Sequence, residues 1–220
     1  MGDIGLKLNG RSPTSHDAIR KMLETFRNSP REIDLVTLGP LTNIALALSI
    51  EPEFAKHVRR CVIMGGTGVL PGNVTVASEF NVWADPEAAR IVFDSDLPLE
   101  MVGWDISVAD AVISDELANQ LSKLSDLGNF AMSIQRQVRE FCRTETKLDG
   151  FDLPDPIAMA VALDSSIVTS EVQKHVRVNL GHGDTRGQTL VDQLEILNIR
   201  NNCRVVLRTD RTKFIEMLRA

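Results

Sequence analysis

Along the first half of this chain, segments with the apolar spacing of a helix alternate with short apolar runs typical of strands. Residues 15–28 have the spacing of an amphipathic helix, which Thr14 or Ser15 would open, and residues 33–38 form a β-branched run typical of a strand. The same order recurs with a helix at 41–50, a strand at 61–64, a helix at 86–94 and a strand at 99–102. This alternation predicts an α/β fold with a mostly parallel, Rossmann-like open sheet flanked by helices.

The second half of the chain has a different pattern. Helical patterns cover residues 114–124, 127–143 and 156–163, and strand-like runs cover 172–180, 188–191 and 205–208, before a closing helix at 210–218. Residues 181–188 are rich in turn formers and predict a hairpin connection. Because the sequence has no repeat, low-complexity tract or linker, we expect residues 1–220 to form a single domain.

The start of the chain is unusual for this fold class. A doubly wound domain normally begins with a strand that becomes central in its sheet, whereas this chain begins with a polar, glycine-containing segment and then a helix. We therefore expect a domain that is incomplete at its N-terminus, with the first βαβ portion missing.

The loop that follows the second strand carries the strongest candidate chemistry. Ligands of parallel sheets bind at the carboxyl ends of strands, which here are residues 38–39, 64–81 and 103–105. Within the second of these, Asn73, Glu79 and Asn81 supply two carboxamides and a carboxylate, which suit the vicinal hydroxyls of a ribose-like ligand. The alternative is a solvated loop whose side chains bond the local backbone.

Composition and charge narrow the classes of partner. The net charge is −6, with Lys and Arg scattered along the chain, so we expect no nucleic acid or anionic membrane as a partner. Three distant cysteines, and no apolar run long enough for a signal peptide or a membrane span, indicate a reducing compartment, and we expect a cytoplasmic protein.

Asp155 and Asp105 are further candidates. Asp155 precedes an apolar helical run, and either caps that helix, with Pro156 in the first helical position, or points its carboxylate at a metal ion. Asp85 has the same arrangement. Asp105 follows a strand, where helix capping or an ion pair with an arginine is at least as good an interpretation as ligand binding. The four histidines lack metal-site spacing and read as surface positions, and no Ser-His-Asp or Cys-His constellation is visible.

Several motifs together carry a family resemblance. They are LVTLGPLTNIA at 35–45, IMGG at 63–66, the stretch from Asn73 to Asn81, DPEAA at 85–89, Asp155-Pro156, and TRGQT at 185–189. In this order they resemble the inosine-uridine preferring nucleoside hydrolases. The resemblance implies hydrolysis of the N-glycosidic bond of ribonucleosides to ribose and free base, calcium as the cofactor, and a homo-oligomer.

The resemblance also implies a role for individual residues. Asn73, Glu79 and Asn81 match the family's ribose-hydroxyl binders, and Met64 matches a residue that lines the sugar pocket. Asp155 matches a calcium-binding carboxylate, and Leu38 stands where a main-chain carbonyl coordinates calcium. In the family, calcium holds a water and the 2′ and 3′ hydroxyls of ribose, and an aspartate takes the proton of that water.

This sequence departs from the family pattern in two places. An Asp-rich motif, D-T-D-x-x-x-D-D, supplies the general base and most calcium carboxylates in the family, but here the only early aspartates are Asp3 and Asp17. We therefore assign no catalytic residue, and expect an incomplete calcium shell and impaired activity. Pro154 stands where many members have a histidine that assists the leaving group.

Three functional hypotheses follow from these residues. The first is a nucleoside hydrolase homologue. The second is a non-catalytic remnant or partner subunit that binds ribosides weakly or pairs with an intact homologue. The third is a generic α/β sugar- or nucleotide-binding module, which the collinear motifs disfavour. A preference for purine or pyrimidine bases is not determined by these residues.

Overall fold

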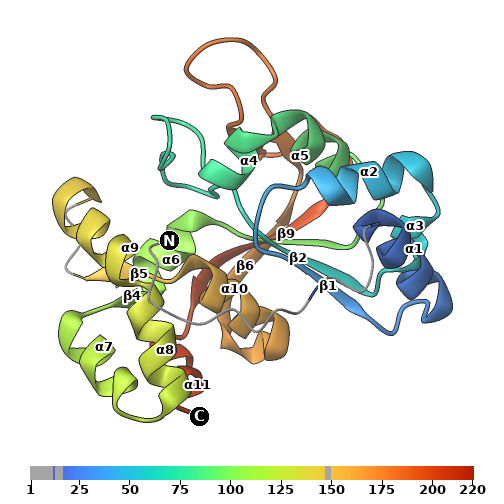
Figure 1. Ribbon diagram of the computed structural model, residues 1–220. Helices are drawn as coiled ribbons and strands as arrows, with labels where there is room; N and C mark the ends of the chain where they lie inside the picture. The colour runs from blue at the N-terminus through green and yellow to red at the C-terminus, as the bar shows by residue number, and fades with distance from the viewer. Residues whose placement is uncertain (1–11, 13–16, 147–149) are drawn as a thin grey trace.

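A mostly parallel sheet forms the centre of the protein, as predicted. The computed structural model describes residues 12, 17–146 and 150–220, and within them a five-stranded sheet has the order β1-β2-β3-β9-β6 (Figure 1). Its strands are β1 (Asp34–Thr37), β2 (Arg60–Met64), β3 (Leu99–Val102), β9 (Cys203–Thr209) and β6 (Val168–Lys174). The first four are parallel to one another, and β6 runs antiparallel to β9.

Helices and two small sheets surround this centre. The helices are α1 (Ala18–Asn28), α2 (Thr42–Ile50), α3 (Phe54–His57), α4 (Phe80–Ala84), α5 (Pro86–Phe93), α6 (Trp104–Asp110), α7 (Asp115–Ser122), α8 (Asp126–Ile134), α9 (Arg136–Phe141), the π-helix η1 (Cys142–Thr146), α10 (Pro154–Leu163), the 3₁₀ helix η2 (Ser165–Ile167) and α11 (Arg211–Arg219). The small antiparallel sheets pair β4 (Val112–Ile113) with β5 (Phe151–Asp152) and β7 (Val176–Val178) with β8 (Thr189–Val191).

Alternate residues of the central strands face two separate cores. In β2, Cys61 and Ile63 pack into a core covered by α1, α2, α3 and α5, whereas Val62 and Met64 pack into a core covered by α6, α7, α10 and α11. Successive side chains of a strand point to opposite sides of the sheet, and both sets are buried because helices cover both faces. The continuous apolar run of β2 is therefore the sequence signature of a three-layer α/β arrangement (Figure 1).

Several predicted elements are corrected by the structure. Helix α1 begins at Ala18, and the Asp17 carboxylate caps it by accepting from the Arg20 N–H at 2.9 Å; the predicted caps at positions 14 and 15 lie outside the described residues. The helix predicted at 127–143 divides into α8, α9 and η1. The strand predicted at 172–180 divides because the Asn202 carboxamide bonds both the N–H and the C=O of Val176, which takes the place of ladder partners.

The sequence pattern missed the short helices α3, α4 and α6 and the two-residue strands, which are too short to show a period. The predicted hairpin is confirmed, since β7 and β8 flank it as an antiparallel pair. Cys61, Cys142 and Cys203 are all buried. Among the described residues, no helix has the length and apolar character needed to cross a membrane.

Candidate functional site

A cavity of about 450 Å³ opens at the carboxyl edge of the sheet. Leu38 directly follows β1, Met64 ends β2, and Trp104 lies two residues beyond β3, so the cavity is where ligands bind in parallel sheets. The other lining residues are Asn73, Val74, Glu79, Phe80, Asn81, Val138, Phe141, Cys142, Asp152, Pro154 and Asp155. The structure thus places around one cavity all six residues for which the family resemblance implied a ligand or metal role.

Glu79 is held rigidly in the wall of this cavity. Its extended backbone ends the loop after β2, and its buried carboxylate caps α4, accepting hydrogen bonds from the Asn81 N–H at 2.8 Å and the Val82 N–H at 3.2 Å. The Gly66 N–H donates a third bond at 2.9 Å. Burial raises the pKa of Glu79, the three N–H donors oppose that shift, and the Asp155 charge adds to it.

The two asparagines are oriented by the same segment. The Asn81 carboxamide donates from Nδ2 to the Met64 carbonyl at 3.1 Å and to the Met64 sulfur at 3.2 Å. The Asn73 Oδ1 atom accepts from the Phe80 N–H at 2.9 Å. Side-chain bonds to the backbone were the expected alternative to ligand binding. Asn73 and Asn81 make such bonds and also line the cavity.

Asp155 does not cap its helix, so the capping interpretation is wrong. Helix α10 begins at Pro154, and its N-cap is Leu153. Two prolines flank Asp155, and the first of them occupies the first helical position, which puts Asp155 inside the first turn. Asp85, with the same local sequence, does cap α5, by accepting from the Ala88 N–H at 3.0 Å.

The Asp155 carboxylate remains available to a ligand. Its side chain is accessible from the cavity, and no hydrogen bond or ion pair reaches it from the described part of the chain. Removal of water by the surrounding protein raises the pKa of Asp155. With Glu79 nearby, two carboxylates share this cavity, and a bound cation would offset the charge of both.

An apolar wall completes the cavity, and sequence reasoning missed it. Its members Val74, Phe80, Val138 and Phe141 are between 38% and 57% exposed. Phe80 lies between two predicted site residues, which could have revealed it, whereas nothing in the pattern of the predicted helix at 127–143 singles out Val138 or Phe141.

Trp104 and Asp152 form another part of the lining. The Trp104 Nε1–H donates to Asp152 Oδ2 at 3.0 Å, and the Ser107 hydroxyl donates to the same oxygen at 2.7 Å. The buried Asp152 carboxylate therefore fixes the indole in the cavity wall. Since the two residues are 48 positions apart, no local sequence signal connects them.

Asp105, in contrast, is not part of the cavity lining. It is 3% exposed and accepts from the Gly68 N–H at 3.1 Å and the Val69 N–H at 3.0 Å. Burial raises the pKa of Asp105, against the effect of these donors. Its carboxylate anchors the loop after β2, and no ion pair with an arginine is found in the described part of the chain.

The metal-binding capacity of the site is limited. Across residues 12, 17–146 and 150–220, no group of three or more His, Cys, Asp or Glu side chains could hold a metal ion. The Asp155 carboxylate and the Leu38 carbonyl are two oxygen donors, whereas calcium takes about six to eight. The described residues alone therefore do not fit a calcium ion.

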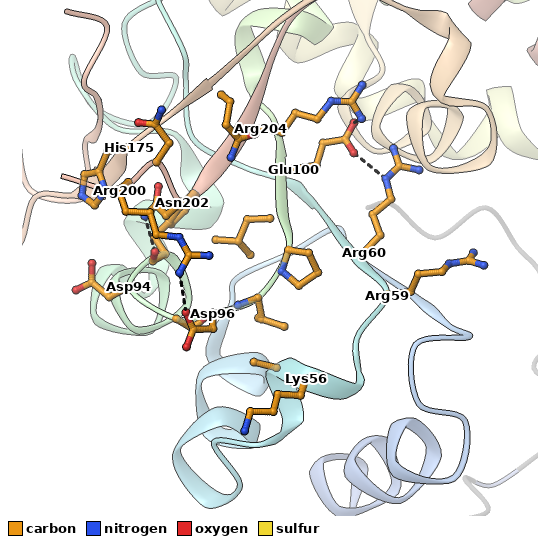
Figure 2. A pocket seen from close by; sticks show the side chains of 18 of the residues that line it. Lys56, Arg59, Arg60, Asp94, Asp96, Glu100, His175, Arg200, Asn202 and Arg204 are labelled. Carbon is orange, nitrogen blue, oxygen red and sulfur yellow. Dashed lines mark hydrogen bonds and ion pairs between the residues drawn. The ribbon is translucent and has the colours of Figure 1, made fainter. Parts of the chain in front are cut away.

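A larger groove of about 1050 Å³ lies at the opposite, amino edge of the sheet (Figure 2). Most of its charged side chains have ion-pair partners. Buried Glu100 lies 2.7 Å from Arg60 and 3.2 Å from Arg204, and the Arg60 guanidinium also donates to the carbonyls of Val161 and Ala162. Because its central arginines already have partners, we interpret this groove as a structural ion-pair region.

Fold and cavity together define an α/β protein with a partly polar cavity at the carboxyl edge of its sheet. The chain belongs to the inosine-uridine preferring nucleoside hydrolase family, whose model matches residues 1–216. It is 34% identical over 212 residues to the pyrimidine-specific ribonucleoside hydrolase RihA of Salmonella typhi, a match that covers 94% of this chain. The chain spans 66% of the length of that relative.

Solved structures give the same assignment. The plant nucleoside hydrolase PpNRh1 superposes with a TM-score of 0.92 at 28% identity, over 99% of this chain and 70% of the plant one. The purine-preferring ribonucleoside hydrolase from Gardnerella vaginalis superposes with a TM-score of 0.85 at 28% identity, over 96% of this chain and 66% of that one.

Proposed function

We propose that the carboxyl-edge cavity binds the ribose of a ribonucleoside and that the protein hydrolyses the N-glycosidic bond, giving ribose and a free base. The observation that carries this proposal is the convergence of Asn73, Glu79, Asn81 and Asp155 on one cavity. The similarity to ribonucleoside hydrolases favours this reading over a non-catalytic relative.

The chemistry of the cavity wall suits a nucleoside. Asn73 and Asn81 offer amide donors and acceptors, and the fixed Glu79 carboxylate accepts from a sugar hydroxyl. Met64 lines the sugar side, and the apolar wall suits a planar base. In the reaction, the bond between the anomeric carbon and the base nitrogen breaks, the oxygen of water bonds to that carbon, and one proton of the water ends on the base. Pro154 provides no proton for the departing base.

Calcium is part of this proposal as a cofactor. The Asp155 carboxylate and the Leu38 carbonyl would be two of its oxygen ligands, and the remaining oxygens would come from water, substrate hydroxyls or protein groups beyond the described residues. The general base likewise has no assigned residue in this chain. Burial raises the pKa of Asp155, and a cation beside it would favour its ionised form.

The direct test is ribose release from inosine, uridine and a nitrophenyl riboside, with calcium and with a chelator. Release above the rate of an Asp155→Ala variant supports hydrolysis by this chain. Binding of ribose without release indicates the non-catalytic alternative. If the chain neither releases nor binds ribose, the proposal is wrong.

We also propose that the protein self-associates or pairs with a longer homologue, and that its ligands include neither nucleic acid nor membrane. The net charge of −6 supports the second part, because phosphate-rich partners require basic surfaces. Light scattering of the purified chain, alone and mixed with a longer homologue, tests the first part. A cytoplasmic location remains a prediction from the sequence.

A further inference from the structure

The loop that leaves β2 is fixed through its backbone by side chains from distant segments. Four successive N–H groups donate to side-chain oxygens. The pairs are Gly66 with Glu79 at 2.9 Å, Thr67 with Thr189 at 2.9 Å, Gly68 with Asp105 at 3.1 Å and Val69 with Asp105 at 3.0 Å. The first of these bonds orients the carboxylate assigned to ribose.

Thr189 makes two hydrogen bonds to Thr67, the second of these four residues. Its hydroxyl accepts from the Thr67 N–H and donates to the Thr67 carbonyl at 2.8 Å, so one side chain satisfies both backbone polar groups of a buried residue. Its methyl packs against Gly66, whose φ of +69° already favours glycine. A Cβ built on Gly66 would lie 2.6 Å from Thr189 Cγ2. The position of the segment from Gly66 to Thr67 is therefore set by Thr189.

The hairpin that ends at Thr189 also holds the far end of the same loop. The Ser78 hydroxyl donates to the Arg186 carbonyl, and the Arg186 guanidinium pairs with Glu87 at the start of α5. The β7–β8 hairpin thus contacts both ends of the loop that carries Asn73 and Glu79.

We propose that Thr189 is a positioning residue for the ribose site. It does not line the cavity, but it fixes the segment whose Gly66 N–H orients Glu79. Without the hydroxyl, the buried Thr67 N–H and C=O lose their partners, and the loop must shift to satisfy them. Glu79 shifts with it. This inference rests on the proposed ribose-binding role of Glu79.

The test compares Thr189→Val, which keeps the shape and removes the hydroxyl, with Thr189→Ser, which keeps the hydroxyl. Titration calorimetry of the full chain with D-ribose and with inosine, in the presence of calcium chloride, should show about tenfold weaker binding for the Val variant. The Ser variant should bind like the unmodified protein. The matched control is Thr209→Val, which removes another buried threonine hydroxyl, one bonded to Asp110 at 3.2 Å.

Hydrogen exchange at the Gly66 amide separates positioning from general stability. Thr189→Val should speed hydrogen exchange at the Gly66 amide, even though that amide donates to Glu79 and not to Thr189. Thr209→Val should lower thermal stability without changing exchange at Gly66. Ribose affinity and Gly66 exchange that are unchanged in Thr189→Val would overturn the inference. If the unmodified chain neither binds ribose nor releases it from inosine, the proposed function fails, and Gly66 exchange still decides whether Thr189 positions the loop.

Discussion

The two ends of the central sheet carry acidic residues in opposite circumstances. At the amino end, the groove is the larger of the two hollows, and its buried Glu100 is matched by Arg60 and Arg204. At the carboxyl end, Glu79 and Asp155 share a smaller cavity, with no ion pair to either in the described part of the chain. The paired charges of Glu100, Arg60 and Arg204 stabilise the structure, whereas the carboxylates of Glu79 and Asp155 lack an ion pair among the described residues and line the candidate site.

Helix direction explains this difference. Helices α4, α6 and α10 begin at the carboxyl end of the sheet, where helix N-termini favour negative groups. Helix α10 ends at the other side, where Arg60 donates to its last carbonyls. Cations at that end therefore complement helix C-termini, and a large groove lined by them need not be a binding site.

The largest expected effect is on activity at the carboxyl end. Asp155→Asn removes the charge but keeps the shape, so ribose release should fall by about 10³-fold. Because burial raises the pKa of Asp155, its ionised form is disfavoured in the folded protein, and the neutral Asn should leave the free energy of unfolding unchanged or higher at pH 7. Rate assays and thermal denaturation of the same sample measure both quantities.

Asp85→Ala is the matched control, since Asp85 also precedes a proline at the start of a helix. It caps α5, so its loss should lower stability by about 1 kcal/mol and leave ribose release unchanged. A loss of stability without a loss of activity in Asp155→Asn would mean that Asp155 is structural, like Asp85.

The amino end should respond in the reverse way. Glu100→Gln breaks a buried pair and leaves two arginines without their shared carboxylate, which should cost about 3 kcal/mol of stability with ribose binding intact. Glu171, the exposed partner of Arg204, provides the control, because Glu171→Gln should cost less than about 1 kcal/mol. Weaker ribose binding in Glu100→Gln, at a temperature where it is folded, would contradict the division between the two ends.

The sequence predicted those features of the fold and the site that depend on residues close together in the chain. Strands β1, β2 and β3 follow from short apolar runs, and the ligand-edge loop follows from polar residues placed directly after β2. Hydrogen bonds between residues far apart in the chain could not be predicted from a local pattern. Trp104 and Asp152 are 48 residues apart, and Thr67 and Thr189 are 122 apart.

The start of α10 shows a different limit of sequence reasoning. Pro154 and Pro156 both offer a first helical position, and local propensity does not choose between them. The structure begins the helix at Pro154, which moves Asp155 from the cap into the first turn. A single position thus changes the interpretation of Asp155 from a local cap to a carboxylate available to a ligand.

A smaller effect is expected from Asn73, at the exposed side of the carboxyl-end cavity. Asn73→Asp keeps the Oδ1 acceptor for the Phe80 N–H and replaces the amide donor, so stability should hold while ribose affinity falls about tenfold. Asn73→Ala should lose the same affinity and also about 1 kcal/mol of stability. Equal ribose affinity in Asn73→Asp and the unmodified protein would exclude donation by this amide.

The smallest expected effect concerns Asp164, which lies at the opposite end of α10 from Asp155. Asp155 in the first turn has a raised pKa, whereas Asp164 at the C-cap accepts from Lys213 and the Ser166 N–H, which lower its pKa to about 2 from 3.8. A lowered pKa in the folded state means that the stabilisation by Asp164 is complete above about pH 5 and is lost as the pH falls through 3.8 toward 2.

Asp164→Asn should therefore be less stable than the unmodified protein at pH 7, and the difference should shrink between about pH 4 and pH 2. Chemical denaturation at several pH values measures it, and ribose release at pH 7 should not change, because Asp164 does not line the cavity. A difference that grew on acidification would show that the ionised Asp164 is not stabilised by Lys213. The opposite pKa shifts at the two ends of α10 would then no longer distinguish a paired carboxylate from one available to a ligand.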